Sequence, residues 1–229
     1  MARKHHIVFL TGAGISQESG ISTFRDQNGL WENYAITEVA SPEGFAKNPQ
    51  LVLDFYNARR KQLDEVVPNL AHELIAQLEQ KYKVTVITQN VDDLHERAGS
   101  TNVIHLHGEL KKCRSVLDDT EIFDYHYPLQ LGDLAPNGGQ LRPHIVWFGE
   151  AVPLIDLAIE VTQTADLFVI VGTTMQVQPA ASLLLSVPID VQTVYIDVAP
   201  DVDKGINLLV LKEKATIGMQ VLVNDYLPY

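Results

Sequence analysis

"IVFLTGAGIS", residues 7–16, joins a short apolar run directly to a turn that contains two glycines. The apolar run is continuous rather than alternating, which is typical of a strand that is buried on both faces. Gly12 and Gly14 permit a tight turn in which backbone amides approach a ligand closely. The next residues, "ISQESG", are expected to open a helix whose N-terminus favours phosphate. Such a turn is typical of a dinucleotide-binding sheet, but the spacing is not a full G-x-G-x-x-G, and glycine turns also occur for structural reasons.

Apolar runs of the same kind recur along the chain and alternate with helical patterns. The further runs are "VTVIT" (84–88), "HIVWF" (144–148), "LFVIVG" (167–172) and "TVYID" (193–197). The helical patterns cover 48–63, 69–82 and 154–165. Strands that alternate with helices predict an α/β fold with a Rossmann-like, doubly wound parallel sheet. The segments 25–65 and 111–142 do not fit this alternation, so we expect them to form a small inserted lobe within one domain over 1–229.

The composition excludes several classes of function. The 229 residues carry a net charge of −12 and a pI near 5.0, which opposes non-specific binding to nucleic acid or to anionic membranes. No segment approaches the roughly twenty apolar residues of a membrane span. One cysteine excludes an internal disulfide and fits a reducing compartment, so we expect a cytoplasmic protein. A monomer is the favoured oligomeric state.

Small or polar residues follow three of the predicted strands at the points where these strands end. They are Gln89, Asn90 and Asp92, then Gly172, Thr173 and Thr174, and finally Asp197. The carboxyl ends of parallel strands meet at one edge of a sheet, where ligands bind in such folds. Asn90 or Asp92 could instead only cap the next helix, as Asn and Asp often do. Two polar side chains and an amide within four residues are nevertheless more than a helix cap requires, which favours a ligand site at this edge.

The stretch "IHLHGELKKC" (104–113) allows either a metal site or a catalytic base. His105, His107 and Glu109 would lie on one face of a strand, and together with Cys113 they are ligand types that Zn²⁺ accepts. The other interpretation is a single histidine that takes up a proton beside a cofactor.

Taken together, these segments resemble the sirtuin family of NAD⁺-dependent protein-lysine deacylases. The matching motifs follow the order of that family over residues 12–179, and "IDVAP" (196–200) matches more loosely. The motifs are "GAGIS", "GISTFR", "TQNVDDLHERAG", "HLHGEL", "RPHIVWFGE" and "GTTMQVQP". Several motifs in the correct order form a more specific signal than one glycine turn.

The resemblance implies a role for each matching position. His107 is the implied general base, and Asn90 and Asp92, as further catalytic residues, line the implied nicotinamide pocket. The residues implied to bind NAD are Gly12, Ala13, Gly14, Ile15, Ser16, Thr23, Phe24, Arg25, Trp31, Gln89, Asn90, Val91, Asp92, Gly172, Thr173, Thr174, Asp197, Val198, Ala199 and Ala215. In the implied reaction the acyl-lysine oxygen displaces nicotinamide, and a ribose hydroxyl, deprotonated towards the histidine, then attacks. The products are lysine, nicotinamide and O-acyl-ADP-ribose.

Most members of that family hold a structural zinc ion with two Cys-x-x-Cys pairs, which this chain lacks. Because a closed cysteine site needs four thiolates, Cys113 alone cannot form one. Substitution by His126, His144 or nearby Asp residues would need three ligands to converge from an irregular loop, so we expect no metal. The small lobe is expected to be held by packing of its apolar residues Ile122, Phe123, Tyr125, Tyr127 and Leu131.

The segment "DFYNARR" (54–60) carries a signal for the acyl group. Tyr56 and Arg59 are three residues apart and share a helix face, and the class of sirtuins that removes acidic acyl groups has a Tyr-x-x-Arg pair here. Arginine binds a carboxylate through paired hydrogen bonds, although a solvated helix face is the alternative. We expect desuccinylation or demalonylation beside deacetylation. The residues implied to bind the acyl-lysine protein or peptide also include Val146, Phe148, Gly149, Glu150 and Val177, on strands that sandwich the substrate.

Three other functions compete with deacylation. A nicotinamide-dependent dehydrogenase would need a larger substrate domain than these inserts provide. An NAD hydrolase or ADP-ribosyltransferase is the main alternative, because sirtuin-like sites support such reactions. A zinc hydrolase that uses His105, His107 and Glu109 would be sensitive to chelators and indifferent to NAD⁺.

Overall fold

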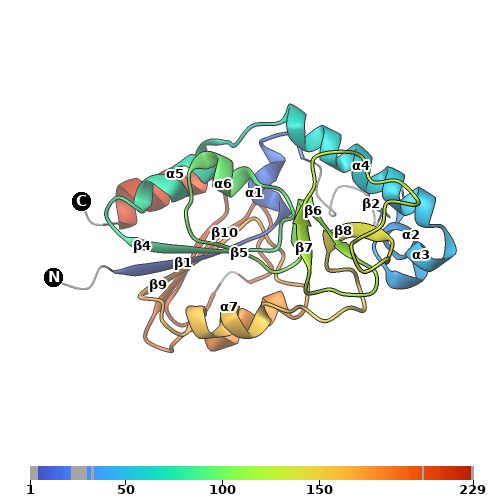
Figure 1. Cartoon of the computed structure of the whole chain (residues 1–229). Helices are drawn as coiled ribbons and strands as arrows, with labels where there is room; N and C mark the ends of the chain where they lie inside the picture. Colours follow the sequence, from blue (N-terminus) through green and yellow to red (C-terminus); the bar gives the residue numbers. More distant parts are fainter. Residues whose placement is uncertain (1–4, 22–29, 32–33, 203, 228–229) are drawn as a thin grey trace.

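A six-stranded parallel sheet forms the centre of the larger part of the molecule (Figure 1). The computed structural model describes residues 5–21, 30–31, 34–202 and 204–227. In this part of the chain the strand order is β11-β10-β9-β1-β4-β5, and every neighbouring pair is parallel. The strands are β1 (His6–Thr11), β4 (Lys83–Thr88), β5 (Val103–His105), β9 (Leu167–Val171), β10 (Gln192–Ile196) and β11 (Leu208–Leu211). The predicted Rossmann-like, doubly wound sheet is confirmed.

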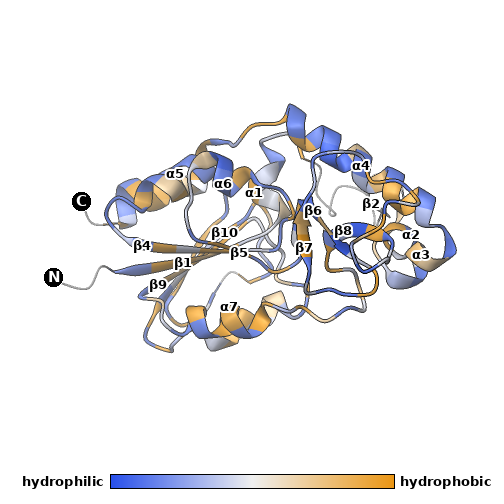
Figure 2. Cartoon of the chain, in the orientation of Figure 1, coloured by the Kyte–Doolittle hydropathy of each residue, from blue (hydrophilic) through white to orange (hydrophobic). Residues whose placement is uncertain are grey.

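Helices cover both faces of this sheet, which explains the continuous apolar runs. Ile7 and Phe9 of β1 belong to one buried cluster with α5 and α8, whereas Val8 and Leu10 belong to another with α7 and η2. Figure 2 shows these strands as mostly hydrophobic along their length. The helices are α1 (Ala13–Gln17), α5 (Leu70–Leu78), α6 (Leu94–Ala98), α7 (Ile155–Thr162), η2 (Ala180–Ser186), α8 (Ala215–Val221) and η3 (Leu222–Tyr226). Alternate side chains of one strand therefore fill two different cores.

Two predicted helices begin at asparagine caps. The side chain of Asn48 accepts a hydrogen bond from the amide of Leu51 at the start of α4 (Pro49–Glu65). The side chain of Asn69 accepts one from the amide of Ala71 at the start of α5. Such caps satisfy amides that have no partner within the helix. The two helices predicted after Asn69 and around 154–165 exist but are shorter than their patterns.

A second group of elements forms a smaller lobe beside the sheet, shown to the right of β5 in Figure 1. Its three-stranded antiparallel sheet has the order β7-β6-β8. The elements of this lobe are β2 (Leu30–Trp31), β3 (Tyr34–Ala35), α2 (Ile36–Val39), α3 (Pro42–Lys47), α4, β6 (Gly108–Ser115), β7 (Ile122–Asp124) and β8 (Leu141–Ile145). The prediction that 144–148 is a strand of the central sheet is wrong. An apolar run indicates burial, but it does not indicate in which sheet the residues are buried.

The core of the small lobe differs in part from the predicted one. Its buried cluster consists of Leu53, Cys113, Leu129, Ala135 and Leu141, with Phe123 and Tyr125 packed against it as predicted. The expected contributions of three other residues are wrong, because Ile122, Tyr127 and Leu131 are 47%, 76% and 48% exposed. An antiparallel sheet commonly leaves one face in water, and irregular segments show no period that separates the two faces.

Polar side chains of α4 bind β6 and the irregular segment that follows β7. The Arg60 guanidinium, 5% exposed, donates from Nε to the carbonyl of Leu110 at 3.0 Å and from Nη1 to that of Tyr127 at 3.4 Å. The Asn57 side chain bonds both the amide and the carbonyl of Leu129, at 2.9 and 2.8 Å. The bonds to Tyr127 and Leu129 satisfy backbone groups of the loop.

Among the residues with a described placement, no group of three or more His, Cys, Asp or Glu side chains is arranged to hold a metal ion. The expected absence of zinc remains a prediction. Likewise, none of the described helices combines the length and the apolar character that crossing a bilayer requires.

Candidate functional site

The glycine turn after β1 packs tightly against the end of β9. The amide of Gly12 donates to the carbonyl of Val171 at 3.1 Å, and that of Gly14 donates to Gly172 at 2.8 Å. A Cβ atom at Gly14 would lie 2.7 Å from the Cα of Gly172. These glycines are therefore required by the close approach of two strand ends, and their own amides are already bonded. This differs from the expectation that the amides of Gly12 and Gly14 face a ligand.

Three predicted residues form one buried hydrogen-bonded group beside this turn. The Asn90 side chain donates to the carbonyl of Gly12 at 3.2 Å and to the Ser16 hydroxyl at 3.1 Å. The Ser16 hydroxyl donates to Oδ2 of Asp92 at 2.9 Å. The other oxygen of Asp92 accepts from the amide of Leu94 at 3.2 Å. Capping of α6 therefore does not account for both oxygens of Asp92, because the second oxygen accepts the hydrogen bond from Ser16.

Burial raises the pKa of Asp92 to about 6. The side chain is 7% exposed, and removal from water disfavours the charged form. The hydrogen bonds from Ser16 and Leu94 act in the opposite direction, but they do not cancel the effect. Near neutral pH this carboxyl group can therefore exist in both protonation states, which allows it either to accept or to donate a hydrogen bond.

The ends of β4, β9 and β10 are also linked. The Gln89 side chain donates to the Thr173 hydroxyl at 3.0 Å, and the Tyr195 hydroxyl donates to the Thr173 carbonyl at 2.8 Å. Asp197, 5% exposed, accepts from the amide of Ala199 at 2.8 Å. These polar residues gather at the carboxyl ends of the strands on both sides of β1, which is the edge of the sheet that the sequence predicted.

The remaining predicted cofactor residues are placed less uniformly. Ala13 and Ile15 lie in α1, Thr174 follows β9 half-buried, and Val198 is 47% exposed. Val91 and Ala215 pack in hydrophobic clusters. Thr23, Phe24 and Arg25 lie outside the described residues, and of Trp31 only the backbone in β2 is described.

Of the two histidines of "HLHGEL", His105 ends a strand and His107 lies in the turn that follows it, so the prediction of one continuous strand is wrong. The strand β5 ends at His105, and β6 begins at Gly108. Gly108 has a φ of +79°, and a Cβ there would collide with the carbonyl of His144. This backbone conformation favours glycine and separates the environments of the two imidazoles.

His107 has the hydrogen bonding of a base. Its Nδ1 lies 3.0 Å from the carbonyl oxygen of Gln89, and since a carbonyl only accepts, Nδ1 carries the proton. In the neutral ring, Nε2 is then the nitrogen with a lone pair. Burial lowers the pKa of His107, so the ring is neutral at pH 7.

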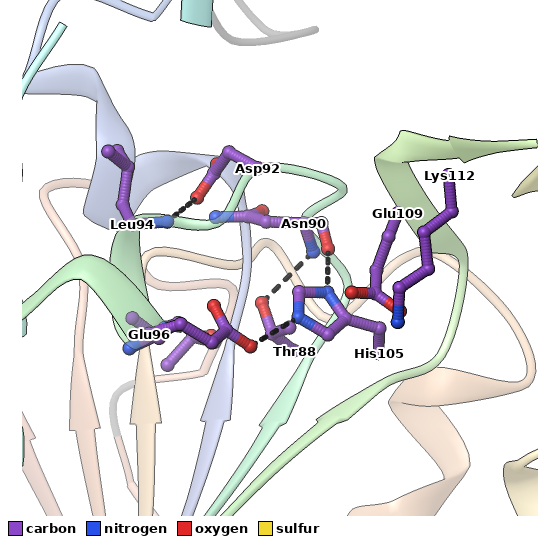
Figure 3. A network of polar contacts seen from close by, with 10 residues as sticks. Thr88, Asn90, Asp92, Leu94, Glu96, His105, Glu109 and Lys112 are labelled. Carbon is purple, nitrogen blue, oxygen red and sulfur yellow. Dashed lines mark hydrogen bonds and ion pairs between the residues drawn. The ribbon is translucent and has the colours of Figure 1, made fainter. Parts of the chain in front are cut away.

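His105 is bonded through both ring nitrogens (Figure 3). Nδ1 lies 3.0 Å from the carbonyl oxygen of Asn90, and Nε2 lies 2.8 Å from Oε1 of Glu96. Neither nitrogen remains for a metal ion, which removes a necessary ligand from the zinc hydrolase that uses His105, His107 and Glu109.

Tyr56 and Arg59 lie on α4 against an aromatic cluster. Tyr56 is fully buried, and its hydroxyl accepts a hydrogen bond from Nε1 of Trp147 at 3.0 Å. Burial raises the pKa of Tyr56. The Arg59 guanidinium lies 5.5 Å from the ring centroid of Phe55, within the range of a cation–π contact. A solvated helix face does not describe this pair.

The segment 146–150 follows β8 without being part of a strand, in contrast to the prediction. The amide of Val146 donates to the carbonyl of His107 at 2.9 Å, which brings this segment next to His107. Phe148 is 51% exposed, and Gly149 and Val177 also lie at the surface. Glu150 has a different environment from the one expected, because its carboxylate is bonded to Arg142 at 2.6 Å and to Arg114 at 3.2 Å.

Comparisons with known proteins agree with this geometry. The model of the Sir2 family matches residues 12–179, which is most of the chain. The chain belongs to the Sir2 family. A relative from Bacteroides thetaiotaomicron is 51% identical over 97% of this chain and 98% of its own length, and one from Helicobacter pylori is 54% identical over 95% and 96%. Both are named NAD-dependent protein deacylase.

Solved structures of Sir2 homologues share the fold. A complex of a Sir2 homologue with NAD superposes with a TM-score of 0.85 at 40% identity, covering 96% of this chain and 88% of that one. A Sir2 variant with a deacetylated p53 peptide and 3'-O-acetyl ADP-ribose gives a TM-score of 0.78 at 29% identity, with coverages of 97% and 94%. The resemblance to the sirtuins is thereby confirmed at the level of the family.

Two residues of this Sir2 site were not predicted from the sequence. Glu96 binds His105 from α6, and Trp147 binds the hydroxyl of Tyr56 from the segment after β8. In each case the partners come from different elements, so neither spacing nor periodicity indicated the contact.

A hollow of about 660 Å³ lies elsewhere, at the amino ends of the central strands. His6, Lys83 and Asp166 contribute to its lining. It is at the opposite end of the sheet from the Sir2 motifs, where parallel sheets do not normally bind their ligands.

Proposed function

We propose that this chain is an NAD⁺-dependent protein-lysine deacylase that releases nicotinamide and transfers the acyl group to ADP-ribose. The observation that carries the proposal is His107, a neutral imidazole with Nε2 as its basic nitrogen. Its Nδ1 is bonded to the carbonyl of Gln89, the residue directly before the buried group of Asn90 and Asp92. A base needs a lone pair and a pKa no higher than the working pH. Relatives that are named NAD-dependent protein deacylase support the same reaction.

The polar residues at the carboxyl edge of the sheet fit NAD⁺. The amide of Asn90 and the carboxyl group of Asp92 offer a donor and an acceptor for a carboxamide, and Gln89, Thr173 and Asp197 offer groups for ribose hydroxyls. When bound, NAD⁺ supplies an ADP-ribosyl group that is activated by the departure of nicotinamide. A well-packed edge of this kind limits the access of water to the reacting centre.

We further propose that His107 accepts the proton of a ribose hydroxyl at Nε2. Its Nδ1–H remains bonded to the Gln89 carbonyl, which fixes the ring orientation. Because burial lowers the pKa of His107, the base stays available at neutral pH and is lost when the pH falls below that lowered value.

Tyr56 and Arg59 are the proposed reading site for an acidic acyl group, which adds desuccinylation and demalonylation to deacetylation. Support comes from their position on one face of α4 and from the aromatic surroundings of both side chains. A guanidinium in such surroundings binds a carboxylate more strongly than in water, because the effective dielectric constant is lower. The hydrogen bond from Trp147 orients the Tyr56 hydroxyl.

Acylated proteins or peptides are the proposed substrates, bound along 146–149 and Val177. The exposure of Phe148 and Val177 supports this assignment, since an extended peptide can pair with exposed backbone and place its side chains in shallow contacts. Glu150 is omitted, because its ion pairs with Arg142 and Arg114 hold the segment itself.

A zinc-free small lobe inserted into a single catalytic domain is also proposed. The buried Cys113 and the bonds that Arg60 and Asn57 make to the loop carbonyls of Tyr127 and Leu129 support it. These contacts stabilise the loop after β7 in the way a metal ion would otherwise do.

The reaction can be tested by mass spectrometry of the products formed from NAD⁺ and matched acetyl-, succinyl- and malonyl-lysine peptides. We expect nicotinamide, free lysine and O-acyl-ADP-ribose in equal amounts. His107→Asn is expected to lose at least about a hundredfold in rate, whereas the exposed control His5→Asn keeps the rate of the original chain. Consumption of NAD⁺ without deacylation would instead identify an NAD hydrolase or ADP-ribosyltransferase.

The acyl preference needs a second comparison on the same helix. Arg59→Met is expected to lose at least about tenfold in removal of succinyl and malonyl groups but little in deacetylation, since only the acidic groups require the guanidinium. The exposed Lys61→Met, two residues further along α4, is the matched control. Equal effects of Arg59→Met on all three acyl groups contradict the assignment.

A further inference from the structure

His105 differs from His107 in its protonation. Its Nδ1 faces the carbonyl of Asn90 at 3.0 Å, and its Nε2 faces the Glu96 carboxylate at 2.8 Å. Both partners are acceptors, so both ring nitrogens donate and the ring is an imidazolium. The hydrogen bond and the charge of Glu96 raise the pKa of His105, against the opposing effect of burial. One motif therefore holds a neutral base and, two residues earlier, a buried cation.

The cation holds one of two consecutive carbonyl groups in the turn after β4. His107 binds the carbonyl of Gln89, and His105 binds that of Asn90. The amide of Asn90 also donates to the Thr88 hydroxyl at 3.0 Å. The peptide groups on both sides of the Asn90 Cα atom are thus fixed by contacts from β4 and β5 (Figure 3).

The orientation of the Asn90 side chain depends on these backbone contacts. Its amide group donates to Gly12 and to Ser16, and Ser16 in turn donates to Asp92. A rotation of the 90–91 peptide group would move the Asn90 side chain, from which these hydrogen bonds begin. Hydrogen bonds from charged donors resist such rotation more strongly than neutral ones.

We infer that the Glu96–His105 ion pair is a positioning device, which holds the Asn90 carbonyl and thereby the arrangement of Asn90 and Asp92 that receives nicotinamide. This inference rests on the proposed function, in which these two residues bind the carboxamide of NAD⁺. Neither His105 nor Glu96 touches the reacting atoms in this scheme. They act through the turn between β4 and α6.

The cation also acts on Asp92 through space. Its charge lowers the pKa of Asp92, whereas burial raises it to about 6. Loss of the imidazolium would leave Asp92 more often protonated at neutral pH. Geometry and charge at the nicotinamide end of the site therefore change together when the ion pair is broken.

The test compares calorimetric binding of NAD⁺ and of ADP-ribose, which lacks nicotinamide. Glu96→Gln keeps the shape and one hydrogen bond but removes the charge that sustains the imidazolium. It is expected to weaken NAD⁺ binding by about tenfold, the cost of one charged hydrogen bond, and to change ADP-ribose binding by less than about twofold. Glu96→Asp is expected to recover part of the loss, and the exposed Glu160→Gln on α7 is the matched control.

Two results would overturn the inference. Glu96→Gln that binds NAD⁺ as tightly as the original chain contradicts any positioning role. An equal loss for NAD⁺ and ADP-ribose reveals a general structural defect, which urea unfolding of the same sample would register. By contrast, an original chain that binds neither nucleotide contradicts the proposed function itself, so the two failures are distinguishable.

Discussion

Lowering the pH from 7 to 5 is expected to destabilise the fold through His72. This side chain is fully buried in α5, and its Nδ1 accepts a hydrogen bond from the amide of Asn69 at 3.3 Å. Its ring lies edge-on to that of His95, with centroids 4.9 Å apart. Burial lowers the pKa of His72 from 6.5 to about 4, because a second proton would place a charge between two layers of the core.

The magnitude follows from the difference between the folded and unfolded pKa values. Since the folded value is the lower one, the unfolded chain binds the proton more tightly. The stabilisation is complete above pH 6.5 and is lost as the pH falls towards 4. Between pH 7 and pH 5 the loss from His72 alone is about 2 kcal/mol. Burial also lowers the pKa of His95 well below its ordinary value, which adds to the loss.

Asp92 changes the free energy of unfolding in the opposite direction between pH 7 and pH 5. Burial raises its pKa to about 6, so the folded chain binds this proton more tightly and gains about 1 kcal/mol between pH 7 and pH 5. The gain from Asp92 therefore offsets part of the loss from His72 and His95 in the original chain. A comparison between two variants at each pH separates the two effects.

The assay is urea unfolding at pH 7 and pH 5 of the original chain, of His72→Asn and of His5→Asn. The asparagine oxygen can replace Nδ1 as the acceptor for the Asn69 amide, but it does not titrate. We expect His72→Asn to be less stable at pH 7 because of the smaller side chain, yet to lose about 2 kcal/mol less than the original chain on acidification. The exposed His5→Asn should follow the original chain. Parallel losses in all three proteins would refute the reasoning.

Further predictions concern packing, ion pairs and metal. Gly14→Ala should destabilise the fold by about 2 kcal/mol or more, because the Cβ would lie 2.7 Å from Gly172; urea unfolding checks this, and unchanged stability contradicts the packing. Glu150→Gln should cost about 2 kcal/mol by leaving the guanidiniums of Arg142 and Arg114 without their carboxylate, with Glu160→Gln as the control. Incubation with a chelator of divalent metals should leave the thermal midpoint unchanged, whereas a fall would reveal a structural metal ion.

Local patterns were sufficient for the framework of the molecule. Continuous apolar runs at 7–11 and 84–88 predicted strands that are buried on both faces, and the two-sided covering of the sheet explains why they do not alternate. The helical patterns at 48–63 and 69–82 predicted two helices, and both begin at asparagine caps, because capping depends on residues within one turn. The polar residues at the strand ends gather at one edge for the same reason, since parallel strands share their direction.

The sequence by itself therefore determined the parallel α/β framework, the sheet edge where the polar residues of the candidate site gather, and the family motifs. Only the tertiary structure decided which nitrogen of His107 is basic, that Glu96 charges His105, and that Trp147 binds Tyr56. The physical reason is that periodicity and capping depend on near neighbours along the chain. Protonation and orientation depend instead on partners that lie 9 to 91 positions away in the sequence and meet only when the sheet and the small lobe are assembled.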